Sequence, residues 1–232
     1  QMVIGMGRTN EYAIKNRTTW NKTGRFRYLQ ADVGNPKSID VLKTIAENGN
    51  CNPMCVIFNA AVIDSDVGHK GNLKLDIFKK INNTGIDGFS NVLEGFSEHL
   101  VSHGGMLVGI SSFSAWIPPM RGNKVAYPAS KAYLDMALRS LRLLWNKKVH
   151  VMTVHLGHLE YEAGTSWFSI PYDNVAEKII KATLCNRPPE NISMPRLYRI
   201  AYKILRLMPD RVVSISVGLL NGLMARILPG KS

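Results

Sequence analysis

Cysteine, acidic residues and long apolar runs are all scarce in this sequence of 232 residues. Its three cysteines, Cys51, Cys55 and Cys185, are an odd number in a chain too long to depend on disulfides, so we expect a reducing compartment. Cys51 and Cys55 stand four positions apart without a second pair or a nearby His, so no metal site is predicted. No apolar run reaches the roughly 18 residues that a membrane-spanning helix needs.

The deficit of acidic residues leaves a strong positive charge. Lys and Arg total 29 against 17 Asp and Glu, a formal net charge of +12, which favours an anionic partner. Basic residues are concentrated beyond residue 186, where Arg196, Arg199, Lys203 and Arg206 line one face of a predicted amphipathic helix. An anionic membrane surface is therefore a candidate partner, and the favoured alternative is that the apolar face packs against the body of the protein or a second subunit. Nucleic acid is not expected, because no aromatic platforms accompany the charge.

Short apolar runs alternate with longer segments of helical periodicity, the pattern of a parallel sheet covered by helices on both faces. The predicted strands are residues 2–6, 27–30, 54–59, 106–111 and 150–155. The predicted helices are residues 38–48, 75–102, 127–146 and 172–185. We therefore predict an α/β fold, a Rossmann-like doubly wound parallel sheet, over residues 1–186. Residues 187–232 are predicted to form a helical C-terminal extension, with one basic amphipathic helix ending at Pro209 and a second helix over 212–228.

The strongest chemical signal is a tyrosine and a lysine in AYPASKAY. Tyr127 and Lys131 stand four positions apart at the start of a predicted helix, so their side chains share one face. A neighbouring ammonium stabilises the phenolate, which lowers the pKa of the tyrosine toward a value useful for proton transfer. A solvated helix face would give the same spacing, so the context decides. The preceding strand, GGMLVGISS, ends at Ser112, and open parallel sheets bind ligands at the carboxyl ends of their strands.

From residue 1 to about residue 185, the order and spacing of these motifs resemble the short-chain dehydrogenase/reductase family, in its compact single-domain branch. The resemblance implies that Tyr127 is the acid/base that exchanges a proton with the substrate oxygen. Lys131 would lower the pKa of Tyr127 and bind the nicotinamide ribose. Ser112 would orient and polarise the substrate carbonyl, and Asn82, in INNTG, would support a proton-relay water.

Two serines compete for the carbonyl-polarising role. In the family the tyrosine follows the serine by about 13 positions, which fits Ser114, whereas Ser112 stands 15 positions before Tyr127. We choose Ser112, because the end of the strand fixes the position better than the count does, and the segment MRGNK can hold a two-residue insertion.

The resemblance also implies a set of residues around the cofactor. These are Arg8, Asp32, Val33, Asn59, Ala60, Ala61, Gly157 and Leu159, together with Tyr127 and Lys131. FNAA at 58–61 departs from the family's Asn-Asn-Ala-Gly at its first and last positions, and LGHLE at 156–160 departs from its Pro-Gly. An acidic residue after the family's second strand selects NAD, and an Arg accepts the 2′-phosphate of NADP. Arg8 follows Gly7 with no acid there, so NADP(H) is favoured over NAD(H).

Aligned on these motifs, the chain is expected to start at the family's second strand. The first strand, a central one, and its Gly-rich pyrophosphate-binding turn are then expected to be missing.

We therefore predict an NAD(P)-dependent oxidoreductase that interconverts an alcohol and a carbonyl, with NADPH-dependent reduction of an apolar or lipid-like substrate favoured. The apolar substrate is suggested by the aromatic residues Tyr161, Trp167, Phe168 and Tyr172. The alternative is a non-catalytic relative that keeps the fold for binding or assembly. The resemblance implies a homodimer or homotetramer. The expected location is the cytoplasm, with attachment to a membrane surface as a further option.

Overall fold

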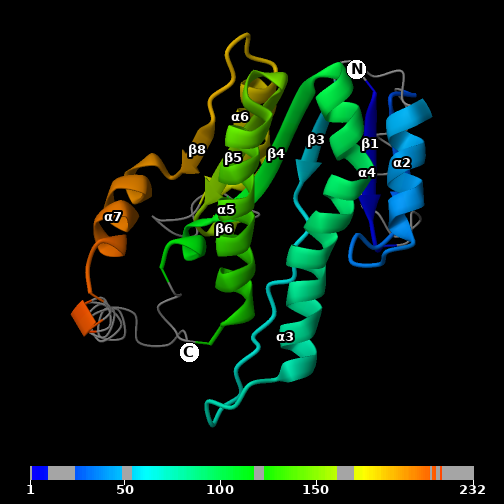
Figure 1. Cartoon of the computed structure of the whole chain (residues 1–232). Helices are drawn as coiled ribbons and strands as arrows, with labels where there is room; N and C mark the ends of the chain where they lie inside the picture. Colours follow the sequence, from blue (N-terminus) through cyan, green and yellow to red (C-terminus); the bar gives the residue numbers. More distant parts are fainter. Residues whose placement is uncertain are drawn as a thin grey trace.

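The computed structural model describes residues 2–9, 24–48, 54–117, 123–160, 170–209, 211–212 and 215. Its strands are all parallel and form an interrupted sheet (Figure 1). One part pairs β1 (Val3–Gly7) with β2 (Phe26–Gln30). The other part has the order β3-β4-β5-β8. Its strands are β3 (Met54–Phe58), β4 (Gly105–Ser112), β5 (Val149–Leu156) and β8 (Asn191–Met194).

Helices connect the strands and cover both faces, so the predicted Rossmann-like α/β fold is confirmed. They are α2 (Ser38–Asn48), α3 (Leu75–Asn82), α4 (Gly88–His103), α5 (Ala126–Trp145), α6 (Tyr172–Thr183) and α7 (Arg196–Arg206). A 3-10 turn, η3 (Phe113–Ala115), follows β4. Two short paired strands, β6 (Leu159–Glu160) and β7 (Ile170–Pro171), lie between β5 and α6.

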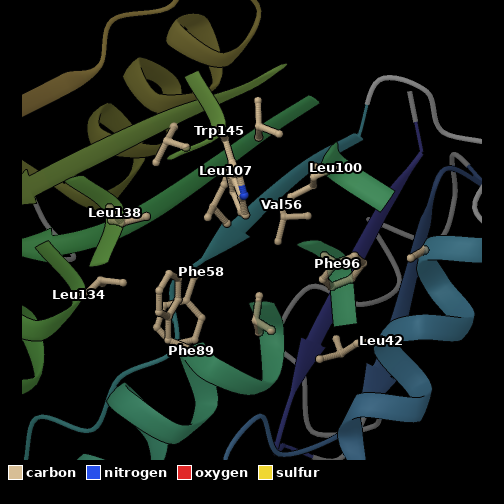
Figure 2. Close-up of a cluster of buried hydrophobic side chains, with 14 residues drawn as sticks. Leu42, Val56, Phe58, Phe89, Phe96, Leu100, Leu107, Leu134, Leu138 and Trp145 are labelled. Carbon is tan, nitrogen blue, oxygen red and sulfur yellow. The ribbon is translucent and has the colours of Figure 1, made fainter. Parts of the chain in front are cut away.

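Two apolar clusters lie on opposite faces of the sheet. On one face, α2, α4 and α5 pack onto β3, β4 and β5, and Figure 2 shows Phe58 and Phe89 against each other with Leu134 and Leu138 beside them. On the other face, Val175 and Ile179 of α6 pack against Val108 and Met152. Burying each such side chain contributes about 1.5–3 kcal/mol. The strand residues alternate between the two clusters, as the two-residue period of a strand requires.

The sheet is interrupted between β1 and β3. Among the described residues, β1 pairs only with β2 and β3 only with β4, and Val3 and Ile57 are exposed by 56% and 47%. Met6 of β1 nevertheless packs against the same cluster as Val56 of β3, so apolar contacts hold the two parts together. The sequence analysis expected a central strand to be missing, and that expectation stays a prediction.

The helix predicted over 75–102 is not continuous. It divides into α3 and α4 around a π-helical turn, η2 (Asn83–Asp87), which contains Gly85 and precedes Gly88. A Cβ atom on Gly85 would lie 2.9 Å from Ser130 Cβ, and one on Gly88 would lie 2.8 Å from Val33 Cγ2. The glycines therefore permit close packing on α5 and on the loop after β2, contacts that local periodicity does not reveal.

The predicted boundary at residue 186 is wrong in one respect. Residues 191–194 form β8, which pairs with β5 and extends the sheet beyond that boundary. The strand was missed because NISM is only four residues long and is followed by Pro195, too short to show periodicity. The predicted helix over 212–228 lies almost wholly outside the described residues.

Candidate active site

The candidate catalytic residues gather where β4 ends and α5 begins. Ser112 is the last residue of β4, and α5 starts at Ala126, so Tyr127 and Lys131 lie on its first turns. Lys131 is 5% exposed, and its Nζ lies 5.9 Å from the centroid of the Tyr127 ring. The two side chains share a face, as their spacing predicted.

Ser112 connects the strand end to the tyrosine. A side-chain hydrogen bond with Ser112 acts on the Tyr127 phenol and lowers its pKa. Ser114 donates to Ser112 Oγ twice, from its backbone nitrogen at 3.1 Å and from its own hydroxyl at 2.9 Å. Ser114 therefore supports Ser112, and Ser112 is the serine that the structure joins to Tyr127.

The net effect on Tyr127 differs from the expectation. Burial raises the pKa of Tyr127 above its ordinary value, and the hydrogen bond with Ser112 only partly offsets this rise. The Lys131 ammonium donates to the Ile110 carbonyl oxygen at 2.7 Å rather than to the phenol, and its charge does not outweigh the effect of burial on Tyr127. A neutral phenol is consequently the stable form at neutral pH.

Lys131 is a buried cation whose ammonium group has N–H donors available for further hydrogen bonds. Burial lowers the pKa of Lys131 to about 8, and the negative charge of Asp135 one turn later partly offsets the decrease. An ammonium group has three N–H donors, and the Ile110 carbonyl accepts one of them. The remaining donors suit the hydroxyl groups of a ribose, so this end of the site fits a nicotinamide cofactor.

Asp66 is an important residue that the sequence analysis missed. It is fully buried, and its two carboxylate oxygens accept from the backbone nitrogens of Val125 at 2.9 Å and Ala126 at 2.8 Å. These nitrogens are at the N-terminus of α5, where negative charge is favourable. Asp66 therefore fixes the first turn of the helix that carries Tyr127. Its partners are about 60 positions away in sequence, so no local motif marks it.

Asn82 is the last residue of α3, next to the π-helical turn, and its side chain is half-buried. The preceding residue, Ile81, is buried in a small cluster with Ala126, against which Tyr127 packs. The end of α3 is thus beside the start of α5, which is consistent with a role for Asn82 close to the tyrosine.

The predicted cofactor residues of β1 and β2 follow the carboxyl ends of these strands. Arg8 is exposed directly after β1, and its backbone oxygen accepts from Gln30 Nε2 at 3.2 Å. Asp32 Oδ1 accepts from the backbone nitrogen of Gly34 at 3.0 Å, so this carboxylate shapes the loop after β2. Val33 is held to α4 by a hydrogen bond from Asn91 Nδ2 to its carbonyl oxygen at 2.6 Å.

The remaining predicted cofactor residues follow β3 and β5. Asn59 is exposed, Ala60 packs against the larger apolar cluster and Ala61 is half-buried. Gly157 donates its backbone N–H to the Met194 carbonyl at 2.8 Å, and Leu159 packs with the smaller cluster. All of the predicted positions therefore lie along the carboxyl edge of the sheet, where a nucleotide binds in open α/β sheets.

A doubly wound parallel sheet with polar and basic side chains at its carboxyl edge is the architecture in which dinucleotides bind. The chain belongs to the short-chain dehydrogenase family, because the sequence model of that family, described as short chain dehydrogenase, matches residues 1–169. It is thus an NAD(P)-dependent oxidoreductase of this type, a class that acts on small molecules and typically forms oligomers. No curated protein sequence matches the chain.

Solved structures share the fold at low sequence identity. A closed form of serine dehydrogenase complexed with NADP+ is 17% identical, with a TM-score of 0.69 over 83% of this chain and 84% of that one. The bulky-bulky ketone specific alcohol dehydrogenase from Comamonas testosteroni is 15% identical, with a TM-score of 0.69 over 99% and 86%. A 4-hydroxyisoleucine dehydrogenase complexed with NADH and succinate is 18% identical, with a TM-score of 0.63 over 84% and 86%. Similar folds thus hold either form of the cofactor.

In the part of the chain that the structure describes, no helix is both long and apolar enough to cross a bilayer.

Proposed function

We propose that the chain reduces a carbonyl compound to an alcohol, with NADP(H) as the preferred cofactor and Asn82, Ser112, Tyr127 and Lys131 as its catalytic residues. The observation that carries this proposal is the side-chain hydrogen bond between Ser112 and Tyr127, close to the buried Lys131. A bound cofactor supplies the hydride for the carbonyl carbon.

The side chains supply the proton and the orientation. The Ser112 hydroxyl donates a hydrogen bond to the carbonyl oxygen, and Tyr127 transfers its phenolic proton to that oxygen. The raised pKa of Tyr127 keeps the phenol protonated at neutral pH, which is the form that an acid needs. The Lys131 ammonium stabilises the phenolate left behind, and Asn82 supports the water that returns the proton.

An apolar substrate is supported by the segment that follows β5. β6 and β7 pair in parallel shortly after Gly157, at the carboxyl edge of the sheet. The aromatic residues Tyr161, Trp167 and Phe168 stand between these strands in the sequence and lie outside the described residues, and exposed Tyr172 begins α6. Reduction of apolar aldehydes and ketones, compared with small polar ones under NADPH, tests the substrate class. Faster turnover of the polar compounds would contradict it.

The choice between the serines has a direct test. Ser112→Ala should lower kcat by about 10²–10³-fold, because it removes the donor aimed at the developing charge on oxygen. Ser114→Ala should reduce kcat only a few-fold, because Ser114 acts through Ser112. Steady-state oxidation of NADPH measures both variants. A larger loss in Ser114→Ala would transfer the role to Ser114.

The preference for NADP(H) is supported by Arg8, an exposed cation at the carboxyl end of β1. Arg8→Asp should lower kcat/KM for NADPH by about 10–100-fold, because it removes a charged hydrogen bond to the 2′-phosphate. Activity with NADH should be kept or increased. Arg27→Asp, on exposed Arg27 of the neighbouring β2, makes the same charge change and should leave the cofactor ratio unchanged. If the ratio of kcat/KM for NADPH to kcat/KM for NADH were the same in both variants, the role of Arg8 would be refuted.

A homodimer or homotetramer is supported by the outer face of α5. Tyr133, Met136, Leu143 and Leu144 lie on one side of this helix and are exposed, Leu143 by 79%. An apolar stripe of this kind is typical of an interface. Light scattering on the purified chain measures the assembly, and a monomer at micromolar concentration would contradict it.

A further inference from the structure

A pocket lies on the side of α5 that carries Asp135, Arg139 and Arg142. Its volume is about 290 Å³, and it is enclosed by α5, α7 and the adjacent strands β5 and β8. Five cations face it: Arg139 and Arg142 of α5, and Arg199, Lys203 and Arg206 of α7. We call this cavity the basic pocket. None of the residues that line the pocket is among the predicted catalytic or cofactor-binding residues, although Gly157 bonds to Met194, the neighbour of Ser193.

The floor of the basic pocket is polar. Thr153 and His155 of β5 are in register with Asn191 and Ser193 of β8, so all four side chains share one face of the sheet. Ser193 and His155 are only 6% and 4% exposed. Within the described part of the chain, Ser193 Oγ and His155 Nδ1 have no hydrogen-bond partner. Buried polar atoms are normally satisfied, so these two have hydrogen-bonding capacity available to a bound group.

The one carboxylate in the lining does not neutralise the cations. Asp135 Oδ2 accepts from Trp116 Nε1 at 2.9 Å and from His155 Nε2 at 2.8 Å. Burial raises the pKa of Asp135, but these bonds and the charge of His155 outweigh it and lower the pKa overall. Asp135 is therefore an ionised group whose Oδ2 is held by its own neighbours, while its buried Oδ1 has no hydrogen-bond partner among the described residues.

The guanidinium group of Arg142 also interacts with residues of the protein itself. It donates to the Val151 carbonyl, to Thr153 Oγ1 and to the Glu190 carbonyl, and it lies 3.7 Å from Glu190 Oε2. The other four cations, Arg139, Arg199, Lys203 and Arg206, make no ion pair with any described residue. Like charges brought together around a cavity repel, and an anion bound between them would remove that repulsion.

We propose that the basic pocket binds a phosphate group, with cations from two helices around it and the Ser193 hydroxyl below. A phosphate has up to two charges and several acceptor oxygens, which suit guanidinium groups arriving from different directions. A carboxylate would satisfy fewer of these donors. A nucleic-acid strand would need an extended basic track with free aromatic rings, whereas Trp116 packs on His155 with ring centroids 4.5 Å apart.

The phosphate has two chemical sources. A soluble phosphorylated compound would enter the pocket from solution. A phosphorylated lipid headgroup would enter while apolar residues on and directly after α7 contact the bilayer, since Ile200, Ile204 and Leu207 are exposed by 63%, 53% and 87%. Both sources present the same group to the same side chains.

Calorimetric titration of the full chain with inorganic pyrophosphate tests the proposal. Saturable binding at one site is expected. The double variant Arg199→Gln with Lys203→Gln should weaken it by at least about tenfold, because two charged hydrogen bonds are lost. Ser193→Ala, which changes no charge, should weaken it a few-fold. The matched control is Lys37→Gln with Lys70→Gln, two exposed lysines elsewhere, which should leave it within about twofold.

Absence of saturable binding, or equal losses in the pocket and control variants, would overturn the proposal. Unchanged binding in all variants would do so as well, because the pyrophosphate would then occupy another site. Circular dichroism melting checks that each variant is folded. Vesicles containing a phosphorylated phosphoinositide identify the source: competition with pyrophosphate supports a lipid headgroup, and no competition supports a soluble phosphate.

Discussion

Tyr127→Phe should abolish nearly all turnover while the protein remains folded. The phenol is the group that we propose gives a proton to the substrate oxygen, and general acid catalysis contributes about 10²–10⁴-fold to a rate. The ring packs against Val62, Ile81 and Ala126, and phenylalanine keeps these contacts. The free energy of unfolding should therefore change by less than about 1 kcal/mol.

The comparison variant is Tyr133→Phe, which removes a hydroxyl from the same helix. Tyr133 is exposed, and its hydroxyl lies 3.4 Å from Ser90 Oγ, away from the strand end. Stopped-flow and steady-state oxidation of NADPH should show wild-type rates for this variant. Tyr127→Phe activity above about a tenth of wild type would place the proton donor elsewhere.

Asp66→Ala should destabilise the protein and slow it as well. Two buried backbone N–H groups at the start of α5 would lose a charged acceptor, at a cost of about 1.5–3 kcal/mol for each such bond. For a chain of this size the melting temperature should fall by roughly 6–24 °C. The first turn of α5 would also loosen, so kcat should fall together with stability because Tyr127 is on that turn.

A neighbouring carboxylate provides the control. Asp64 is 53% exposed and pairs with Lys80 at 3.2 Å, a surface contact worth at most about 1 kcal/mol. The melting temperature of Asp64→Ala should therefore be close to that of wild type. Asp66→Asn keeps one acceptor oxygen, so its melting temperature should lie between those of the two alanine variants. If both alanine variants melted alike in differential scanning calorimetry, the anchoring role of Asp66 would be rejected.

Features encoded by short-range patterns were predictable from the sequence. The apolar runs around Val56, Val108 and Val154 indicated buried strands, and the AYPASKAY motif placed Tyr127 and Lys131 on one helical face. Both kinds of signal depend on residues within about one turn or a few strand positions of each other.

Features that depend on distant partners were not predictable. The acceptor role of Asp66 requires Val125 and Ala126, and the π-helical turn reflects the contact of Gly85 with Ser130. The direction of the pKa shift of Tyr127 depends on its burial, and burial exists only once α3 and α5 are packed. The basic face of α7 was visible in the sequence, but the polar floor it meets was not.

Helix α5 has three different faces along its length. One packs on the sheet and carries Tyr127 and Lys131, a second exposes Leu143 and Leu144, and a third presents Asp135 and Arg139 to the basic pocket. The helix is continuous from Ala126 to Trp145, so its three faces are linked by one run of backbone hydrogen bonds. A small rotation imposed by a subunit or by a bound anion would therefore be transmitted to the tyrosine at its first turn. Assembly, anion binding and proton transfer would then all depend on the position of helix α5.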